Sequence, residues 1–359
     1  MSYRSIDILQ KSLASTIFST KKDAKKAAGR ALGTIVELIT YYLLREWGYV
    51  SNICIETKLP EYGNAEITHN VEFTLHSLLS CQACDNPRPL TYSGVRKLFK
   101  YVPAECKSGS FIDKDYIIKN SAVIGKEDGI IGICNATNDK IILSQIAETA
   151  SAMFECKRVG VEDGQKKGPQ TIEKAKQGAY VALKSSSLQK VRDMDGNVYG
   201  VYFTDGKLQT QKYEEALKSC LETGNIENFI LSFGIVSNHG NWFTANDMNK
   251  ELKVLAQSYD RLLFLTDDGL YTFIDKTILH PAPEYTPIRD AFIGSYSEGR
   301  KHNTFTKSRI SLDAHKALTA FFHNNVSSIE NWFNVISPDG MTMTEIRQQL
   351  HTFIYNEKS

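Results

Sequence analysis

Ser151-Ala152-Met153-Phe154-Glu155-Cys156-Lys157 is the stretch that decides how this chain folds. Its small and apolar residues predict a β-strand that ends in an acid-x-lysine triplet. Because side chains alternate along a strand, Glu155 and Lys157 should point to one face and Cys156 to the other. We therefore expect this strand to present a carboxylate and an ammonium group side by side.

A second carboxylate lies upstream, in Glu127-Asp128-Gly129-Ile130-Ile131-Gly132, where Asp128 adjoins another apolar run. We expect Asp128 and Glu155 to meet at one end of a sheet. Two carboxylates suit Mg²⁺, which keeps several waters and binds through one or two carboxylates together with phosphate oxygens. The carbonyl of Cys156 is a further candidate ligand. Lys157 would position or deprotonate an attacking water and offset the local negative charge.

The flanking segments predict an α/β fold. A helix is indicated by apolar residues at helical spacing, namely Leu32, Ile35, Val36, Ile39 and Leu43, and Gly48 should end it. Strands are expected over residues 70–76, 130–134, 141–143 and 229–237.

The region after residue 229 predicts a strand, a helix and another strand. The helix should begin near Thr244 and bury one face as far as Tyr259. Strands are then expected over residues 261–266 and 270–274, joined by a hairpin turn at Asp267-Asp268-Gly269. A strand–helix–strand crossover implies an α/β sheet.

The acid pair and the acid-x-lysine triplet resemble the motif of the PD-(D/E)XK nuclease superfamily, and the whole chain is most similar to its type II restriction endonucleases. The resemblance implies a restriction-endonuclease-like core over residues 1–280, a mixed central β-sheet flanked by helices. Residues 281–359 would form a mainly helical C-terminal extension, and packing of this extension on the same core stays open. Asp128 would be the first acid, Glu155 the second and Lys157 the catalytic lysine, although Glu127 stands where the motif usually has proline.

The same resemblance indicates accessory residues. Glu37, on the first helix, would correspond to a helical acid that assists metal binding in some members. Gln170, Lys174 and Gln177 would lie on a helix that faces the active site or the DNA. The candidate DNA contacts are Lys166, Lys167, Asn238, His239 and Asn241. The basic segments 21–26 and 300–309 are further candidates for phosphate contacts.

The activity implied is Mg²⁺-dependent cleavage of double-stranded DNA at a short sequence. A homodimer is expected because a twofold protein matches palindromic sites, and a restriction enzyme works beside a cognate DNA methyltransferase. Two other functions stay open. One is a structure-specific resolvase or repair nuclease of the same fold, and the other is a catalytically silent DNA-binding or zinc-stabilised protein.

Two other groups of residues are candidates for a site. Glu105-Cys106-Lys107 is a second acid-x-lysine triplet, which Glu72 could complete, but it follows a proline, and proline suits a strand edge or start. A tetrahedral zinc site could be built from His76, Cys81, Cys84 and Cys106. Separate reduced thiols are the preferred interpretation, since no second close cysteine pair exists.

Composition narrows the class of protein. The chain has 359 residues, 42% of them hydrophobic, which is enough for a large core. Lys and Arg total 42 against 41 Asp and Glu, so any affinity for DNA must come from local basic clusters. The chain shows no secretory signal and no apolar run long enough for a membrane span, so a cytoplasmic protein is expected. It also lacks the motifs of P-loop ATPases, zinc proteases, serine hydrolases and dinucleotide enzymes.

Overall fold

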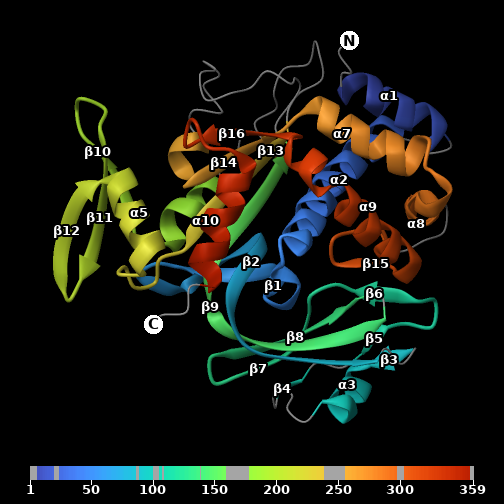
Figure 1. Cartoon of the computed structure of the whole chain (residues 1–359), viewed down its shortest axis with the longest axis horizontal. Coiled ribbons are helices and arrows are strands. Elements are labelled where there is room, and N and C mark those ends of the chain that lie inside the picture. The colour runs from blue at the N-terminus through green and yellow to red at the C-terminus, as the bar shows by residue number, and fades with distance from the viewer. Residues whose placement is uncertain are drawn as a thin grey trace.

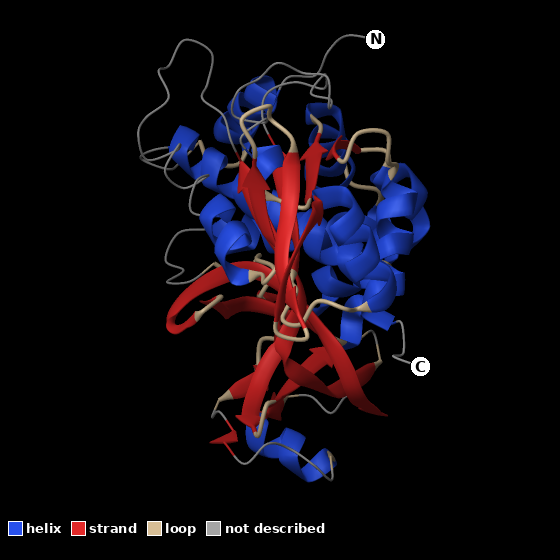
Figure 2. Cartoon of the chain, turned by 90° about the vertical axis from the view of Figure 1, so that its left-hand side faces the viewer, coloured by secondary structure: helices blue, strands red, loops and turns tan. Residues whose placement is uncertain are grey.

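A bent, mixed β-sheet with helices packed on its upper part forms the framework of the protein (Figures 1 and 2). This computed structural model describes residues 6–19, 24–85, 89–99, 105–106, 109–137, 139–158, 178–237, 255–296 and 303–355. The expected α/β class, with a mixed central sheet flanked by helices, is confirmed.

The long strand β9 (Lys140–Arg158) organises this sheet, and it contains the stretch that ends in Lys157. On one edge it pairs antiparallel with β2 (Asn64–Asp85), which in turn pairs with β1 (Ile53–Glu61). On the other edge its first half pairs with β8 (Ile130–Ala136) and its second half with β13 (Leu231–Ser237). The strand carrying the predicted site is therefore hydrogen-bonded along both edges.

Parallel and antiparallel strands extend the sheet from β13. β14 (Arg261–Leu265) lies parallel to β13, as the predicted crossover requires, and β16 (Phe333–Ser337) closes this edge antiparallel. Below the bend, β7 (Ala122–Glu127) and β4 (Glu105–Cys106) follow β8.

Two smaller sheets complete the strands of the described residues. One contains β3 (Leu90–Thr91), β5 (Ser110–Ile112), β6 (Ile117–Lys119) and β15 (Arg309–Ser311). The other projects to the left in Figure 1 and contains β10 (Gln189–Arg192), β11 (Val198–Thr204) and β12 (Lys207–Lys212).

The helices cover both faces of the upper sheet (Figure 2). The predicted first helix is α2 (Ala24–Glu46), whose apolar face is fully buried, and Gly48 follows it with φ 102°. Other helices are α1 (Ile6–Thr16), α3 (Tyr92–Leu98), α5 (Tyr213–Thr223), α7 (Asp267–Ile274), α8 (Thr286–Tyr296), α9 (Leu312–Glu330) and α10 (Met343–Tyr355). Residues 178–185 and 255–258 are also helical. Short helical turns cover Tyr49–Ser51, Asp275–Leu279 and Pro283–Tyr285.

One expected hairpin was wrong. The segment Asp267-Asp268-Gly269 does not turn between two strands but opens α7. Thr266 caps this helix, because its side chain accepts a hydrogen bond of 3.2 Å from the Gly269 amide. The two aspartates occupy the first turn, where the helix dipole favours negative charge.

The chain after residue 281 packs on the same framework. It supplies α8, α9 and α10, and it also supplies β15 and β16, of which β16 belongs to the central sheet. Phe292, Phe321 and Leu350 belong to the main hydrophobic core together with residues of α2.

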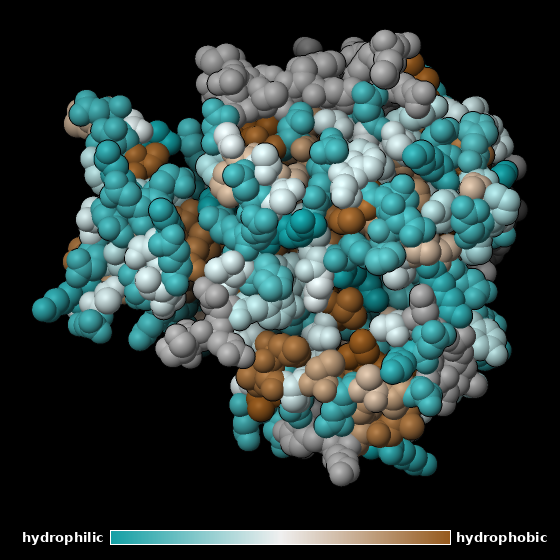
Figure 3. All heavy atoms as spheres, in the orientation of Figure 1, coloured by the Kyte–Doolittle hydropathy of each residue, from teal (hydrophilic) through white to brown (hydrophobic). Residues whose placement is uncertain are grey.

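The surface of the described residues is largely polar, but apolar groups gather over β2, β8 and β9 below the bend (Figure 3). The exposed apolar residues of β2 include Leu78 and Leu79. No described helix is long and apolar enough to cross a membrane.

Candidate active site

Glu155 and Lys157 lie together near the end of β9. Phe154 stacks on Phe233 of β13 with 4.4 Å between ring centroids, and the Cys156 thiol donates to the Thr40 hydroxyl of α2 over 3.4 Å. These residues face the helix α2, so the alternation of the strand sends Glu155 and Lys157 to the opposite face. Lys157 Nζ lies 3.0 Å from Glu155 Oε2.

A second carboxylate reaches this pair from β2, and it belongs to Glu72. The register Phe73↔Phe154 places Glu72 across from Glu155, and directly opposite residues of antiparallel strands share a face. Lys157 Nζ lies 3.9 Å from Glu72 Oε1. One ammonium group therefore bridges two carboxylates on neighbouring strands.

Glu155 is the buried member of this group, with 4% of its side chain exposed. The helical residues 178–185 cover it, since a Cβ at Gly178 would lie 3.5 Å from Glu155 Cγ and 2.5 Å from the Tyr259 hydroxyl. Burial raises the pKa of Glu155, and the nearby Glu37 carboxylate raises it further, while the Lys157 ammonium lowers it only in part. Its Oε2 is buried and accepts no well-aligned hydrogen bond.

A second lysine approaches the other side of Glu72. Lys307, in the turn before β15, directly contacts Glu72 Oε2 and lies 3.0 Å from Glu37 Oε2 and 3.5 Å from Glu56 Oε1. The accessory acid Glu37, predicted on the first helix, is thus brought to the site. Glu56 was not predicted at the site, and Lys307 was expected only as part of the basic segment 300–309 that would contact phosphates.

The placement of Asp128 at this site was wrong. Asp128 and Gly129 form the two-residue turn between β7 and β8, with φ of 47° and 76°. The Glu148 amide donates to the Gly129 carbonyl over 2.7 Å, so this turn lies beside Glu148, seven residues before Glu155 on β9. Seven extended residues span on the order of 20 Å along the strand. Asp128 and Glu155 therefore cannot hold one cation, and Glu72 occupies the place predicted for Asp128.

The alternative triplet lies elsewhere. Glu105 and Cys106 form the edge strand β4, paired with Lys126 and Gly125 of β7, and Lys107 lies outside the described residues. The order β9-β8-β7-β4 puts this strand three positions from β9, or about 14 Å at normal strand spacing.

The proposed zinc ligands do not converge within the described part of the chain. His76 is buried, and its ring nitrogens bind the Thr74 hydroxyl at 2.7 Å and the Ala147 carbonyl at 2.9 Å. Burial lowers the pKa of His76 to about 4, so it is a neutral structural residue at the bend of β2. Cys81 and Cys84 are three positions apart on a strand and point to opposite faces.

The five predicted DNA contacts and three of the four accessory candidates lie outside the described residues. These DNA contacts are Lys166, Lys167, Asn238, His239 and Asn241, and the accessory candidates are Gln170, Lys174 and Gln177. Of the basic segment 300–309, Lys307 is buried at the carboxylates and Arg309 pairs with Asp113 over 3.2 Å.

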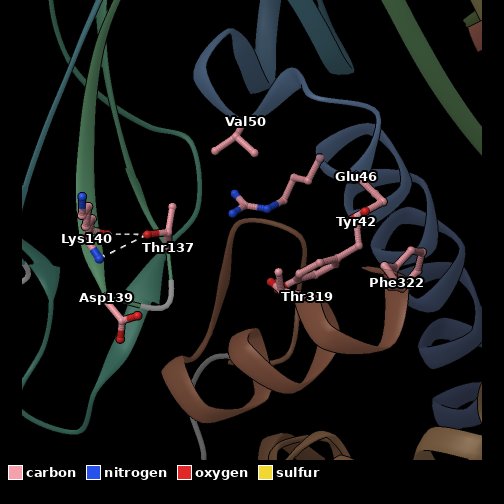
Figure 4. A pocket seen from close by; sticks show the side chains of 9 residues that line it. Tyr42, Glu46, Val50, Thr137, Asp139, Lys140, Thr319 and Phe322 are labelled. Atoms are coloured by element: carbon pink, nitrogen blue, oxygen red, sulfur yellow. Dashed lines mark hydrogen bonds between the residues drawn. The ribbon is translucent and has the colours of Figure 1, made fainter. Parts of the chain in front are cut away.

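A cavity of about 440 Å³ lies between α2, α9 and the turn joining β8 to β9 (Figure 4). Neither Glu155 nor Lys157 lines it. Arg45 in its wall binds the Tyr41 hydroxyl and the Ala136 carbonyl, and Glu46 pairs with His323 over 2.9 Å. Arg45 and Glu46 therefore already have structural partners.

The residues around Glu155 fit a small divalent cation. Mg²⁺ needs only one or two protein carboxylates, and Glu72 and Glu155 supply two on facing strands. The buried Glu155 Oε2 lies 3.0 Å from Lys157 Nζ but accepts no well-aligned hydrogen bond, and it is the oxygen that such an ion would use. No three His, Cys, Asp or Glu side chains of the described residues are placed to hold a metal. The ammonium groups of Lys157 and Lys307 lie beside these carboxylates.

Comparison of the chain with protein-family models, with curated proteins and with solved structures finds no match. What the site does must therefore be argued from its own residues.

Proposed function

We propose that this protein is a Mg²⁺-dependent endodeoxyribonuclease that hydrolyses phosphodiester bonds of double-stranded DNA. The observation that carries the proposal is the meeting of Glu72, Glu155 and Lys157 on one face of two paired strands. Carboxylates that hold a hydrated cation beside a lysine are the groups that phosphodiester hydrolysis needs.

The arrangement of the core supports the proposed likeness to the PD-(D/E)XK superfamily. Helix α2 precedes the antiparallel strands β1, β2 and β9. The helical residues 178–185 come next, and β13, which is parallel to β9, follows after the small sheet β10–β12 and α5. We propose that these elements are the restriction-endonuclease-like core, with Glu72 in place of Asp128 as the first acid. The segment β3 to β8 would then be an insertion between the two acidic strands.

Each side chain has a distinct role in the proposed reaction. Mg²⁺, when bound, would neutralise charge on the scissile phosphate and lower the pKa of a coordinated water. Glu72 and Glu155 would hold the ion. Lys157 Nζ, near both carboxylates, would orient the attacking water and stabilise charge that develops on the phosphate. The helix over Glu155 would exclude bulk water from this side of the site.

The finer proposal is a type II restriction enzyme. Such an enzyme would cut at a short sequence, act as a homodimer on palindromic sites and require a cognate DNA methyltransferase in the same cell. These features rest on the resemblance of the sequence motif.

The proposed activity is tested by incubating the protein with unmethylated plasmid and Mg²⁺. Discrete fragments with 5′-phosphate ends are expected. Nicking that depends on branched DNA would favour a resolvase, and DNA that is bound but uncut would favour a silent binding protein. A plasmid neither bound nor cut would remove the proposal.

Cation binding should release protons from Glu155. Because its pKa is raised in the folded protein, part of the Glu155 population carries a proton at mildly acidic pH, and a bound cation must displace that proton. Affinity for Mn²⁺ should therefore fall as pH falls through this raised pKa. Calorimetry in two buffers of different ionisation enthalpy measures the protons released.

The control for this measurement is Glu148→Gln, which changes an exposed carboxylate on the same strand. It should release as many protons as the wild type. Binding at mildly acidic pH without proton release in the wild type would contradict the raised pKa of Glu155.

A further inference from the structure

The ammonium group of Lys307 lies among three carboxylates, those of Glu37, Glu56 and Glu72. Its Nζ contacts Glu72 directly and is within 3.5 Å of Glu37 and Glu56, which come from α2 and β1. Only 5% of the Lys307 side chain is exposed. Its Nζ also lies 5.7 Å from the centroid of the Phe73 ring. A lysine this buried is rare unless its charge is matched.

The backbone holds Lys307 in this position. The Asn120 side-chain Nδ2 donates to the Lys307 carbonyl over 3.0 Å. The backbone amide of Asn120 donates to the Ser308 carbonyl, also over 3.0 Å. Thr306 and Arg309 exchange backbone hydrogen bonds of 2.9 and 3.3 Å across the same turn. The ammonium group is therefore delivered by a fixed turn and not by a freely moving loop.

Glu72 faces two positive charges with its two oxygens. Oε1 points toward Lys157 and Glu155, whereas Oε2 contacts Lys307 beside Glu37 and Glu56. Many phosphodiester-cleaving enzymes hold two divalent ions roughly 3.5–4 Å apart, and those ions share carboxylate ligands. The positions beside Oε1 and Oε2 of Glu72 correspond to two such cation positions. Lys307 occupies the position beside Oε2.

We propose that the Lys307 ammonium replaces a second divalent cation among Glu37, Glu56 and Glu72, so that the site takes up one divalent ion instead of two. This inference rests on the proposed function, since it assumes that the position between Glu72 and Glu155 binds metal. Removing the ammonium would take the counter-ion from Glu37 and Glu56 and leave Glu72 with Lys157 alone at 3.9 Å, which is unfavourable unless a cation enters.

The test is the number of Mn²⁺ ions bound per chain by Lys307→Met and by the wild type, measured by calorimetry and by electron paramagnetic resonance. Methionine keeps the unbranched stem over Phe73 and removes the charge. We expect one ion for the wild type and two for Lys307→Met. Adding Glu37→Gln to Lys307→Met should return the number to one.

Lys126→Met is the matched control, because Lys126 pairs with the exposed Glu148 away from the site. It should bind one ion. One ion in both the wild type and Lys307→Met would overturn the inference while sparing the proposed function. No ion in the wild type and one in Lys307→Met would support the Lys307 position but contradict the metal site at Glu155.

A folding defect does not prevent the test. If Lys307→Met is unstable without metal, thermal melts with and without Mn²⁺ replace the titration. A rise in melting temperature with Mn²⁺ that is larger for the variant than for the wild type supports the inference, and the absence of such a rise overturns it.

Discussion

Glu72→Gln is expected to slow DNA cleavage on the order of 10³-fold, while Asp128→Asn leaves the rate unchanged. Glutamine has nearly the shape of glutamate but lacks the negative charge that would hold the cation opposite Glu155. Asp128 lies in the exposed turn between β7 and β8, on the order of 20 Å along the strand from the reacting groups. Rates on plasmid at saturating Mg²⁺ measure both effects.

The two substitutions are a matched pair, since each replaces one carboxylate by its amide. Thermal melts should show that both variants are folded. If Asp128→Asn abolished cleavage and Glu72→Gln did not, the site would have to be built around the turn and not around the paired strands.

Phe154→Ala is expected to destabilise the protein by about 3–5 kcal/mol, the usual cost of removing a buried aromatic ring. Phe154 is 1% exposed and stacks on Phe233, so its removal leaves a cavity between β9, β13 and α2. It also loosens the strand that carries Glu155. Urea unfolding measures the loss in free energy.

Phe203→Ala is the control for this measurement, because Phe203 on β11 is 56% exposed. Its effect should be within about 0.5 kcal/mol of zero. A loss below about 1 kcal/mol for Phe154→Ala would mean that the β9–β13 contact is not part of the stable core.

Local patterns in the sequence predicted the framework well. The apolar periodicity of α2 predicted a helix, and the short apolar runs of β8, β9 and β13 predicted strands; the structure contains all four elements. The alternation of Glu155, Cys156 and Lys157 also fixed which two side chains share a face.

Two Asp-Gly segments differ from the prediction, since Asp128 was expected to hold a metal and Asp267-Asp268-Gly269 to form a hairpin turn. Asp128-Gly129 is the two-residue hairpin turn that an Asp-Gly pair between apolar runs favours, and both residues have positive φ. Asp267-Asp268-Gly269 looks similar but follows Thr266, and a threonine at that position caps a helix. The residue before the aspartate distinguishes the two cases.

The partner of Glu155 could not be derived from spacing along the chain. Glu72 precedes it by 83 residues, and the register that joins them depends on bulges in β2 near His76. The available signal was local: Glu72 is the acidic residue on the polar face of an alternating strand. Lys307 gave no such signal, since its position depends on tertiary contacts with Asn120.

The most direct test of the central claim is the location of Mn²⁺ by anomalous diffraction from crystals of the wild-type protein. The account predicts a peak within bonding distance of carboxylate oxygens of both Glu72 and Glu155, with Lys307 still among Glu37, Glu56 and Glu72. A peak at Asp128, or none between Glu72 and Glu155 at saturating Mn²⁺, would contradict it.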